Sequence, residues 1–248
     1  MVGKPKSAEM HAGPGFRVRT EIARPAGEIL EPFKGFDGPD VSDFMNRLYT
    51  MDFGIQAMTP DSPRLVGPAC TVKVFPGDNL MVHKCLDVAQ PGDVVVIDSH
   101  SATAVLGDLI STKARHRGIA GFVVDGLVRD LPEIRAMGEF PVFARGVTPI
   151  GPLHRGPGEI NYPISAGGIV VQPGDIIVAD GNGVVVVPQE IAADLLDRLR
   201  SRQDASRAYN EAVARGEFDN RWVDAILDEG GVSDGVGAAD PAKPPALG

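Results

Sequence analysis

The segment from Gly107 to Asp130, "GDLISTKARHRGIAGFVVDGLVRD", decides the fold class. Its first half has the pattern of a surface helix that ends at Gly118, because glycine commonly terminates helices. Its second half contains "IAGFVVD", a β-branched and apolar run that indicates a buried strand. Further strands are predicted at "VVVID" (94–98) and "PVFARGV" (141–147), and a second helix at "LPEIRAMG" (131–138). This alternation of strands and helices with short connections predicts an α/β fold.

Turn sequences divide the rest of the chain into further elements. The triplet "PGD" occurs at Pro76, Pro91 and Pro173, and a proline followed by a glycine is a turn that leads the chain into its next element. After Thr148, "GGIVVQPGDIIVADGNGVVVVP" (167–188) predicts three strands. The further helices that apolar spacing predicts are Asp40–Tyr49, with Asp40 or Ser42 as N-cap, Asn79–Ala89, and Gln189 to about Gly216.

These elements divide the chain into four segments. Residues 1–39 are rich in glycine and proline and are expected to form an N-terminal arm, and residues 40–188 form the α/β domain. Residues 189–228 form a helical C-terminal extension. Residues 229–248 are expected to be a disordered tail, because they contain no core-forming side chains. A length of 248 residues suits one domain with extended ends.

Charge and composition exclude several classes of protein. A net charge of −9 argues against general binding to nucleic acid or to acidic membranes, because phosphate contacts need clustered Lys and Arg. No apolar run reaches the roughly 18 residues of a membrane span, and no secretion signal is evident, so we expect a cytoplasmic protein. Cys70 and Cys85 are expected to be reduced thiols in the core. Glycine-rich nucleotide-binding motifs are absent from the sequence.

The residues that lead into the first helix allow two interpretations. In the structural one, Asp108 is an N-cap that accepts hydrogen bonds from the first turn. In the functional one, Gly107 and the free N–H groups of Leu109, Ile110 and Ser111 form an anion site at the positive end of the helix. The sequence around this helix start leaves both interpretations open.

The pair Arg129-Asp130 stands at an equivalent position after the next strand. Parallel neighbouring strands bring their following loops to one edge of the sheet, so the pair is expected to lie close to Asp108. A guanidinium binds a carboxylate or an enolate oxygen through two N–H groups. A carboxylate is a hard ligand suited to Mg²⁺ or Mn²⁺. Taken alone, the pair also fits a helix cap and a salt bridge.

Asp108, the twenty residues that follow it and Arg129-Asp130 together resemble the signature of the RraA-like superfamily. This group contains the class II 4-hydroxy-4-methyl-2-oxoglutarate/4-carboxy-4-hydroxy-2-oxoadipate aldolases and the regulators of ribonuclease activity A. The resemblance extends from about Asp40 to Pro188 and includes "PGDVVVID" and "FPVFARGVTP". It implies a swivelling β/β/α fold, a single domain with a long C-terminal helix, assembled as homotrimers or homohexamers with sites between subunits.

The resemblance also implies a lyase of aromatic catabolism that cleaves a 4-hydroxy-2-oxo diacid to pyruvate and a 2-oxo acid, with possible oxaloacetate decarboxylation. Asp130 would hold Mg²⁺ or Mn²⁺, and Arg129 would bind the 2-oxo acid and stabilise its enolate. Asp108 would orient a water on the cation, and the amides of Leu109–Ser111 would hold the pyruvyl carboxylate. Cleavage next to a ketone leaves an enolate, which needs positive charge at its oxygen.

The histidines of the chain carry a weaker signal. The loop "SHSATAVL" (99–106) replaces the small or glycine-rich loop of related sequences. His100 in this loop is a candidate substrate contact or proton donor, with a solvated loop residue as the alternative. His83, His116 and His154 lack metal-ligand spacing and are expected to be surface or packing residues.

The C-terminal helix raises one further candidate. The aldolases are expected to use a glutamate from this helix of a neighbouring subunit, and Glu211 is the nearest candidate, with Asp204 and Glu217 as rivals. A solvated helix face is the alternative for all three. The competing function is a non-catalytic regulator that binds a ribonuclease, because a shared fold does not separate the two. A relative acting on a different 2-oxo acid is a third possibility.

Overall fold

The computed structural model describes residue 11, residues 13–59 and residues 64–231. The chain forms two compact units, which divide between Ser201 and Arg202 inside the long helix α6. The strands are β1 (Phe16–Val18), β2 (Gln56–Ala57), β3 (Leu65–Val74), β4 (Val94–Asp98), β5 (Ala104–Leu106), β6 (Gly121–Val128), β7 (Val142–Val147), β8 (Gly158–Ile160), β9 (Ile164–Ala166), β10 (Ile169–Val171), β11 (Ile176–Asp180) and β12 (Gly183–Val187). The helices are α1 (Gly27–Leu30), η2 (Glu31–Gly35), α2 (Gly38–Phe44), α3 (Leu80–Cys85), α4 (Asp108–His116), α5 (Leu131–Ala136), η3 (Gln189–Ile191), α6 (Ala192–Ala214) and α7 (Arg221–Glu229).

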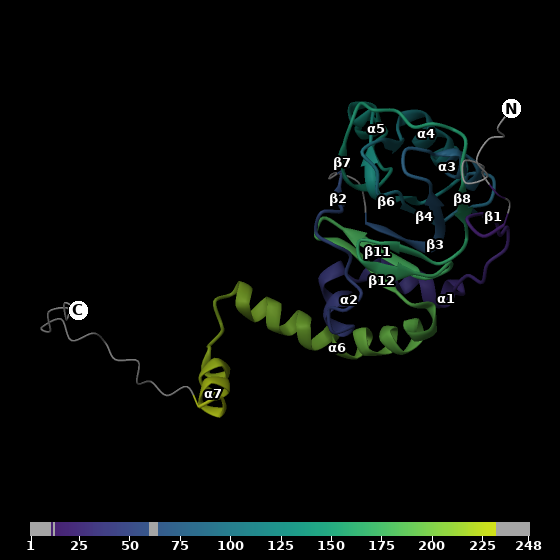
Figure 1. The fold of residues 1–248 in the computed structure, drawn as a ribbon. Coiled ribbons are helices and arrows are strands. Elements are labelled where there is room, and N and C mark those ends of the chain that lie inside the picture. Colours follow the sequence, from purple (N-terminus) through teal and green to yellow (C-terminus); the bar gives the residue numbers. More distant parts are fainter. Residues whose placement is uncertain (1–10, 12, 60–63, 232–248) are drawn as a thin grey trace, which may run out of the picture. The chain divides into compact units, whose positions relative to one another are not determined.

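Four parallel strands form the centre of the sheet and confirm the predicted α/β fold. Neighbouring strands run in the order β3, β4, β6 and β7, and each adjacent pair is parallel. Helices α3, α4 and α5 cover one face of these strands, and the hairpin β11–β12 lies on the other side (Figure 1). Because the four strands are parallel, their carboxyl ends lie at one edge of the sheet.

Strand β3 belongs to two layers of the molecule. Its first four residues pair antiparallel with β11, and from Ala69 onward it pairs parallel with β4. The change falls at Pro68, whose ring nitrogen has no hydrogen to donate to a ladder. One long strand therefore connects the β11–β12 hairpin to the central sheet.

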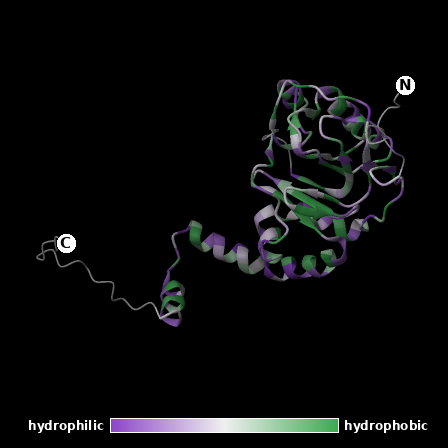
Figure 2. Cartoon of the chain, in the orientation of Figure 1, coloured by the Kyte–Doolittle hydropathy of each residue, from purple (hydrophilic) through white to green (hydrophobic). Residues whose placement is uncertain are grey.

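Alternating side chains of the strands fill three core clusters. In β4, Val95 and Ile97 face the cluster under helices α3–α5, whereas Val94 and Val96 face the hairpin layer. The hairpin repeats this alternation, with every second residue packing instead against α2 and the first half of α6. Figure 2 shows the apolar colour along the strands of the hairpin β11–β12. The period-two pattern thus explains a layered β/β/α arrangement.

Several sequence-based expectations about elements need correction. Helix α2 begins at Gly38 with Asp37 at the N-cap position, so neither Asp40 nor Ser42 caps it. Pro39 in its first turn is the physical reason, because proline fits the start of a helix. Strand β5 lies inside the loop 99–106, where no strand was expected. The three strands predicted after Gly167 are confirmed as β10, β11 and β12.

The ends of the chain show further features. In the segment predicted as an N-terminal arm, Phe33 is fully buried and packs in the cluster that includes Leu195 and Leu199 of α6. Residues 232–248, which form most of the expected tail, lie outside the described residues. Among the described residues, none of the helices is both long enough and apolar enough to cross a membrane.

Candidate active site

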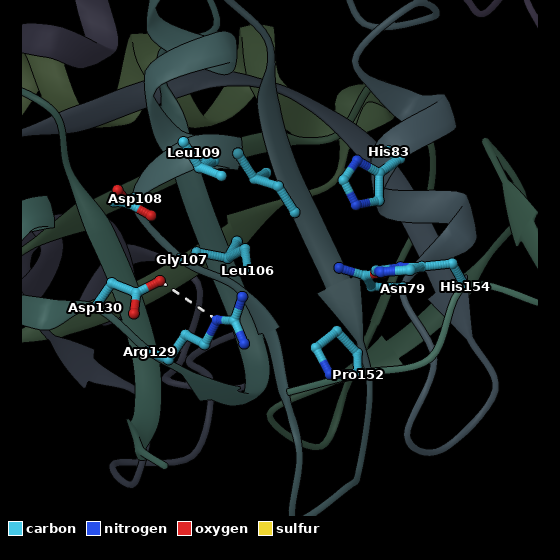
Figure 3. A pocket seen from close by; sticks show the side chains of 11 residues that line it. Asn79, His83, Leu106, Gly107, Asp108, Leu109, Arg129, Asp130, Pro152 and His154 are labelled. Carbon is cyan, nitrogen blue, oxygen red and sulfur yellow. Dashed lines mark hydrogen bonds and ion pairs between the residues drawn. The ribbon is translucent and has the colours of Figure 1, made fainter. Parts of the chain in front are cut away.

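A pocket opens at the edge of the sheet where the central parallel strands end. Its volume is about 250 Å³, below the roughly 300–1,000 Å³ typical of sites for drug-sized ligands, so it suits a small molecule. Figure 3 shows Asp108, Arg129 and Asp130 on one side of it and Asn79, His83 and His154 on the other. The lining residues are Asn79, His83, Leu106, Gly107, Asp108, Leu109, Ile110, Arg129, Asp130, Pro152 and His154.

Arg129 and Asp130 reach the pocket from the loop after β6. The backbone N–H of Arg129 donates to the carbonyl of Leu106 at 3.0 Å, which ties this loop to the end of β5. The Nε of Arg129 lies 3.3 Å from the Oδ2 of Asp130, and both side chains are partly exposed. Asp130 occupies the N-cap position of α5 at φ 54°, and its side chain makes no capping bond. This left-handed backbone is uncommon outside glycine and turns the carboxylate toward the pocket instead of the helix.

Gly107 allows the two loops to approach closely. A methyl group built on Gly107 would overlap the Oδ2 of Asp130 and lie 3.0 Å from the Cγ of Arg129. On the other side, a methyl group built on Gly151 would lie 2.6 Å from the Nη1 of Arg129. The Arg129-Asp130 pair therefore fits between two positions that lack a side chain.

The amino end of helix α4 forms the floor next to this pair, with a different cap from the one expected. Gly107 is the N-cap and Asp108 is the first helical residue, and the cap position makes no side-chain bond. The amides of Asp108, Leu109 and Ile110 consequently lack partners within the helix. Ser111 is fully buried and does not line the pocket, and its amide and its hydroxyl both donate to the carbonyl of Gly107, at 3.1 and 2.9 Å. The free first-turn amides are thus those of residues 108–110, not 109–111.

The opposite wall contains two histidines that were expected to be surface or packing residues. His83 comes from α3 and His154 from the loop after β7, and their rings meet edge to face with centroids 5.3 Å apart. Burial lowers the pKa of His83, and the neighbouring His154 and Lys113 lower it further, so its neutral form is favoured. Asn79, which is 2% exposed, holds the Nδ1 of His154 at 2.6 Å from its Oδ1.

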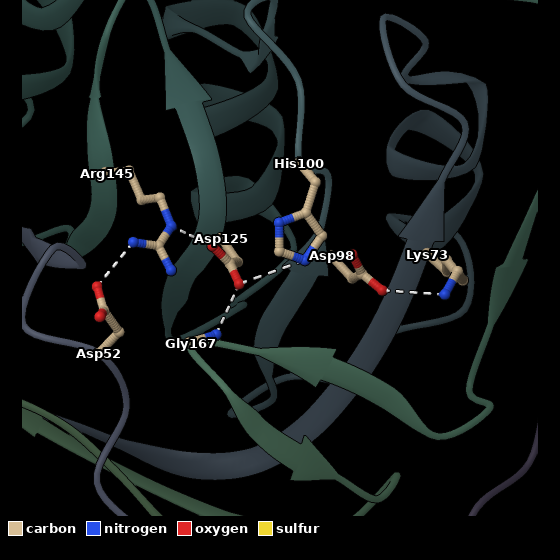
Figure 4. A network of polar contacts seen from close by, with 7 residues as sticks. All are labelled: Asp52, Lys73, Asp98, His100, Asp125, Arg145 and Gly167. Atoms are coloured by element: carbon tan, nitrogen blue, oxygen red, sulfur yellow. Dashed lines mark hydrogen bonds and ion pairs between the residues drawn. The ribbon is translucent and has the colours of Figure 1, made fainter.

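His100 is not among the lining residues and belongs to a different polar network. Its Nε2 lies 3.3 Å from Asp98 and 3.6 Å from the fully buried Asp125, between the two carboxylates (Figure 4). Arg145 also binds Asp125 through its Nε, and this hydrogen bond is the main reason that the pKa of Arg145 is raised. The placement of His100 gives no support to a role as substrate contact, which stays a prediction.

Glu211 lies on α6 within the second unit and is exposed. Its expected role requires a neighbouring subunit, so that role also stays a prediction. Both cysteines are buried and unpaired, as expected for core thiols.

The two loops predicted to converge do line one pocket. Its lining includes Asp108, Leu109, Ile110, Arg129 and Asp130.

The donor set of the pocket decides which cation it suits. In the part of the chain that the structure describes, no group of three or more His, Cys, Asp or Glu side chains could hold a metal ion. The carboxylates among the lining residues are those of Asp130 and Asp108, which stand beside open space. Mg²⁺ commonly binds one or two carboxylates and keeps several waters, whereas catalytic zinc takes about three protein ligands. These residues therefore fit a hard, largely hydrated cation.

Comparison with known families now gives the class of the protein. The model of the RraA-like family, described as Aldolase/RraA, matches residues 38–186. The chain belongs to this family. A relative from Halalkalibacterium halodurans, named "Putative 4-hydroxy-4-methyl-2-oxoglutarate aldolase", is 38% identical over 189 residues, which cover 75% of this chain and 89% of that protein.

Solved structures of relatives share the fold. An uncharacterised protein from Pseudomonas syringae pv. tomato has a TM-score of 0.69 at 30% identity, covering 79% of this chain and 97% of that one. Streptomyces coelicolor RraAS2, described as an unusual member of the RNase ES inhibitor RraA protein family, has a TM-score of 0.68 at 29% identity. That match covers 76% of this chain and 99% of the other. The fold is therefore shared with a protein described as a member of an RNase inhibitor family.

Sequence reasoning missed Asn79 and His154 as pocket residues. Asn79 follows β3, and His154 lies in the loop after β7, so both come from loops at the carboxyl edge of the sheet. A usable signal was present for His154, because the strand "PVFARGV" was recognised and its following loop reaches the same edge. For Asn79 the preceding strand itself went unrecognised.

Proposed function

We propose that this protein is a divalent-metal-dependent aldolase that cleaves a 4-hydroxy-2-oxo diacid to pyruvate and a second 2-oxo acid. The observation that carries the proposal is the meeting of a guanidinium, a carboxylate and an open helix amino end around one small pocket. This combination suits an anionic substrate whose reaction develops negative charge at an oxygen. The name of the Halalkalibacterium halodurans relative supports the substrate class.

Each residue has a definite task in the proposed reaction. The amides of residues 108–110 bind the carboxylate next to the ketone, and Arg129 binds the ketone oxygen. Asp130 would hold Mg²⁺ or Mn²⁺, and Asp108 beside it would orient a water on the cation. The cation supplies positive charge where the oxygen of the pyruvate enolate develops. Loss of CO₂ from oxaloacetate yields the same enolate, so we also expect oxaloacetate decarboxylation.

A coupled assay for pyruvate tests the proposal. The full chain would be assayed with 4-hydroxy-4-methyl-2-oxoglutarate, related 4-hydroxy-2-oxo acids and oxaloacetate, with and without a chelator. We expect pyruvate to form from at least one hydroxy acid, to disappear with the chelator and to return with Mg²⁺ or Mn²⁺. Absence of pyruvate from every substrate in the presence of excess cation would refute the proposed function.

Substitutions at the pair sharpen this test. Asp130→Ala should lower kcat/KM by at least about a hundredfold, because developing oxyanion charge loses its stabilisation. Arg129→Lys should also lower kcat/KM, because the point charge of an ammonium group does not replace the fixed N–H donors of a planar guanidinium. Titration with Mn²⁺, followed by electron paramagnetic resonance, should show weaker binding only for Asp130→Ala. The matched control is Glu133→Ala, because Glu133 is an exposed acid in α5, the helix that Asp130 precedes, and does not line the pocket.

The second candidate function is binding to a ribonuclease, and the likeness to RraAS2 favours it. A pull-down with a ribonuclease of the RNase E type, together with failure of the pyruvate assay, would reverse the ranking.

For the assembly we propose a homotrimer or homohexamer, which light scattering on the purified protein would distinguish.

A further inference from the structure

We propose that His154 is the general base of the cleavage, taking the proton of the substrate's C4 hydroxyl, and that Asn79 orients it for this task. The inference rests on the proposed aldolase function and adds a residue to it. Cleavage of the C3–C4 bond requires a group that removes this hydroxyl proton, and Arg129 and Asp130 have other tasks. His154 lies on the wall opposite them (Figure 3).

The loop that carries His154 is held on both sides of it. Leu153 makes two backbone hydrogen bonds with the loop 75–79, at 2.7 and 2.9 Å. The backbone N–H of Arg155 donates to the side chain of Asp78, which is itself 2% exposed. The residues before and after His154 are therefore fixed to the loop that follows β3. A histidine that is exposed at the surface but anchored in this way keeps its ring at the pocket.

The hydrogen bonds of Asn79 determine which nitrogen of His154 carries the proton. The Nδ2 of Asn79 donates to the carbonyl of Val105 at 2.9 Å. A flipped amide would set two acceptors against each other, so Oδ1 faces the Nδ1 of His154 at 2.6 Å. An amide oxygen only accepts, and Nδ1 must therefore carry the hydrogen. In neutral His154 the Nε2 is left with a lone pair, which is what a general base requires.

The substrate carries its ketone and its hydroxyl on different carbons, and the pocket has polar groups on two walls. With the ketone at C2 held by Arg129, the hydroxyl on C4 is two carbons further along the chain, and the proposal places it at the wall that carries His154. His83 is edge to face with His154, and its lowered pKa keeps it neutral, so it does not oppose a positive charge on His154. Asn79 fixes the His154 ring without bringing a second negative charge into a pocket that must hold an anionic substrate.

The proposed step balances in protons and electrons. Nε2 takes the hydroxyl proton, the oxygen electron pair forms the C4 carbonyl, and the C3–C4 bond breaks. Its electron pair becomes the C2–C3 double bond of the enolate, whose oxygen faces Arg129. The enolate then takes a proton at C3 from water, and the imidazolium returns its proton to the hydroxide that remains.

A comparison of two substrates tests the inference. Oxaloacetate has no C4 hydroxyl, so its decarboxylation requires no base at this position. His154→Ala should lower kcat/KM for 4-hydroxy-4-methyl-2-oxoglutarate by about 10²–10⁴-fold, and that for oxaloacetate by no more than about threefold. His116→Ala, an exposed histidine outside this pocket lining, is the control and should change neither.

A second measurement does not depend on activity. Nitrogen-15 NMR of the histidine rings, with His154 assigned by comparison with His154→Ala, should show the Nδ1–H tautomer for His154. A dominant Nε2–H tautomer, an equal loss on both substrates, or no loss on the hydroxy acid would overturn the inference while leaving the aldolase proposal intact. A wild-type protein that forms no pyruvate from any substrate would instead overturn both.

Discussion

At Gly107 the absence of a side chain has a geometric reason. A methyl group there would overlap the Oδ2 of Asp130 and press on the Cγ of Arg129. Gly107 has φ −147°, a value open to any residue, so the backbone itself does not demand glycine. Because the carboxylate of Asp130 is partly exposed, it has room to turn away. We therefore expect a side chain at this position to harm the site more than the fold.

Gly107→Ala should lower pyruvate formation by about a hundredfold, since a displacement of about 1 Å at a reacting group has effects of this size. The free energy of unfolding should fall by only about 1 kcal/mol, as for alanine at an N-cap. Activity and urea unfolding would be measured together. Gly27→Ala, at the start of α1 with open space around the added methyl, is the matched control. Full activity of Gly107→Ala would contradict the close approach described here.

The residues of the site were predicted to different extents. The sequence predicted that Asp108 and Arg129-Asp130 would lie together, because both follow parallel strands of one sheet. It placed the free amides of α4 at Leu109–Ser111, one residue too far along, because their position depends on whether Gly107 or Asp108 takes the N-cap conformation. The role of Asn79 next to His154 depends on contacts between residues 75 positions apart, which a local pattern does not contain.

Strands β4 and β6 set two like charges side by side. Asp98 and Asp125 pair in register, and like charges directly opposite each other destabilise a sheet. The Nζ of Lys73 forms an ion pair with the Oδ2 of Asp98 at 3.2 Å, and Arg145 forms one with Asp125. His100 lies between the two carboxylates (Figure 4). The N–H of Gly167 adds a hydrogen bond to Asp125 at 2.6 Å, so this network joins β6 and β7 to the turn before β10.

Arg145→Leu should reduce the free energy of unfolding by about 2 kcal/mol, because it leaves the fully buried Asp125 without its cationic partner. This value lies below the roughly 3–5 kcal/mol expected for fully buried pairs, since the Arg145 side chain is 34% exposed. Urea unfolding would measure the change. Asp52→Asn, which removes the exposed partner of Arg145, should have a much smaller effect. Equal effects of the two substitutions would show that Asp125 does not depend on Arg145.

At the level of elements, the sequence predicted the parts with strong local patterns. The strands β4, β6 and β11 and the helices α4 and α5 appear close to the expected positions. Strand β3 was missed because Gly67 and Pro68 interrupt its apolar run, and both residues are needed where it changes partners. Strand β5 was missed because its three residues are defined by pairing with β6, not by their own composition.

The two cysteines report on the integrity of the whole core. Both belong to the cluster between the central sheet and helices α3–α5. Burial raises the pKa of Cys70 to about 12 and that of Cys85 well above its ordinary value. The thiolate, which is the reactive form, is therefore scarce in the folded protein as well as inaccessible.

Labelling with a thiol reagent at pH 8 tests this expectation. At that pH a thiol of pKa about 12 has a thiolate fraction on the order of 10⁻⁴, so the native protein should label roughly a thousandfold more slowly than the urea-unfolded chain. Unfolded protein should yield both thiols. Cys70→Ser and Cys85→Ser would assign the two rates. Rapid native labelling of one thiol would indicate that the sheet opens near β3 or α3.

Each wall of the pocket is attached to a different strand, through loops after β3, β5, β6 and β7. Evolution can therefore rebuild one wall by insertion or exchange while the ladder beneath keeps its pairing. In the proposed aldolase, a histidine loop gained or lost after β7 would change the choice of substrate and would leave the loops that carry Asp108 and Asp130 in place. Relatives with this fold would then diverge by changes in the loops around the pocket, while the sheet and its core stay unchanged.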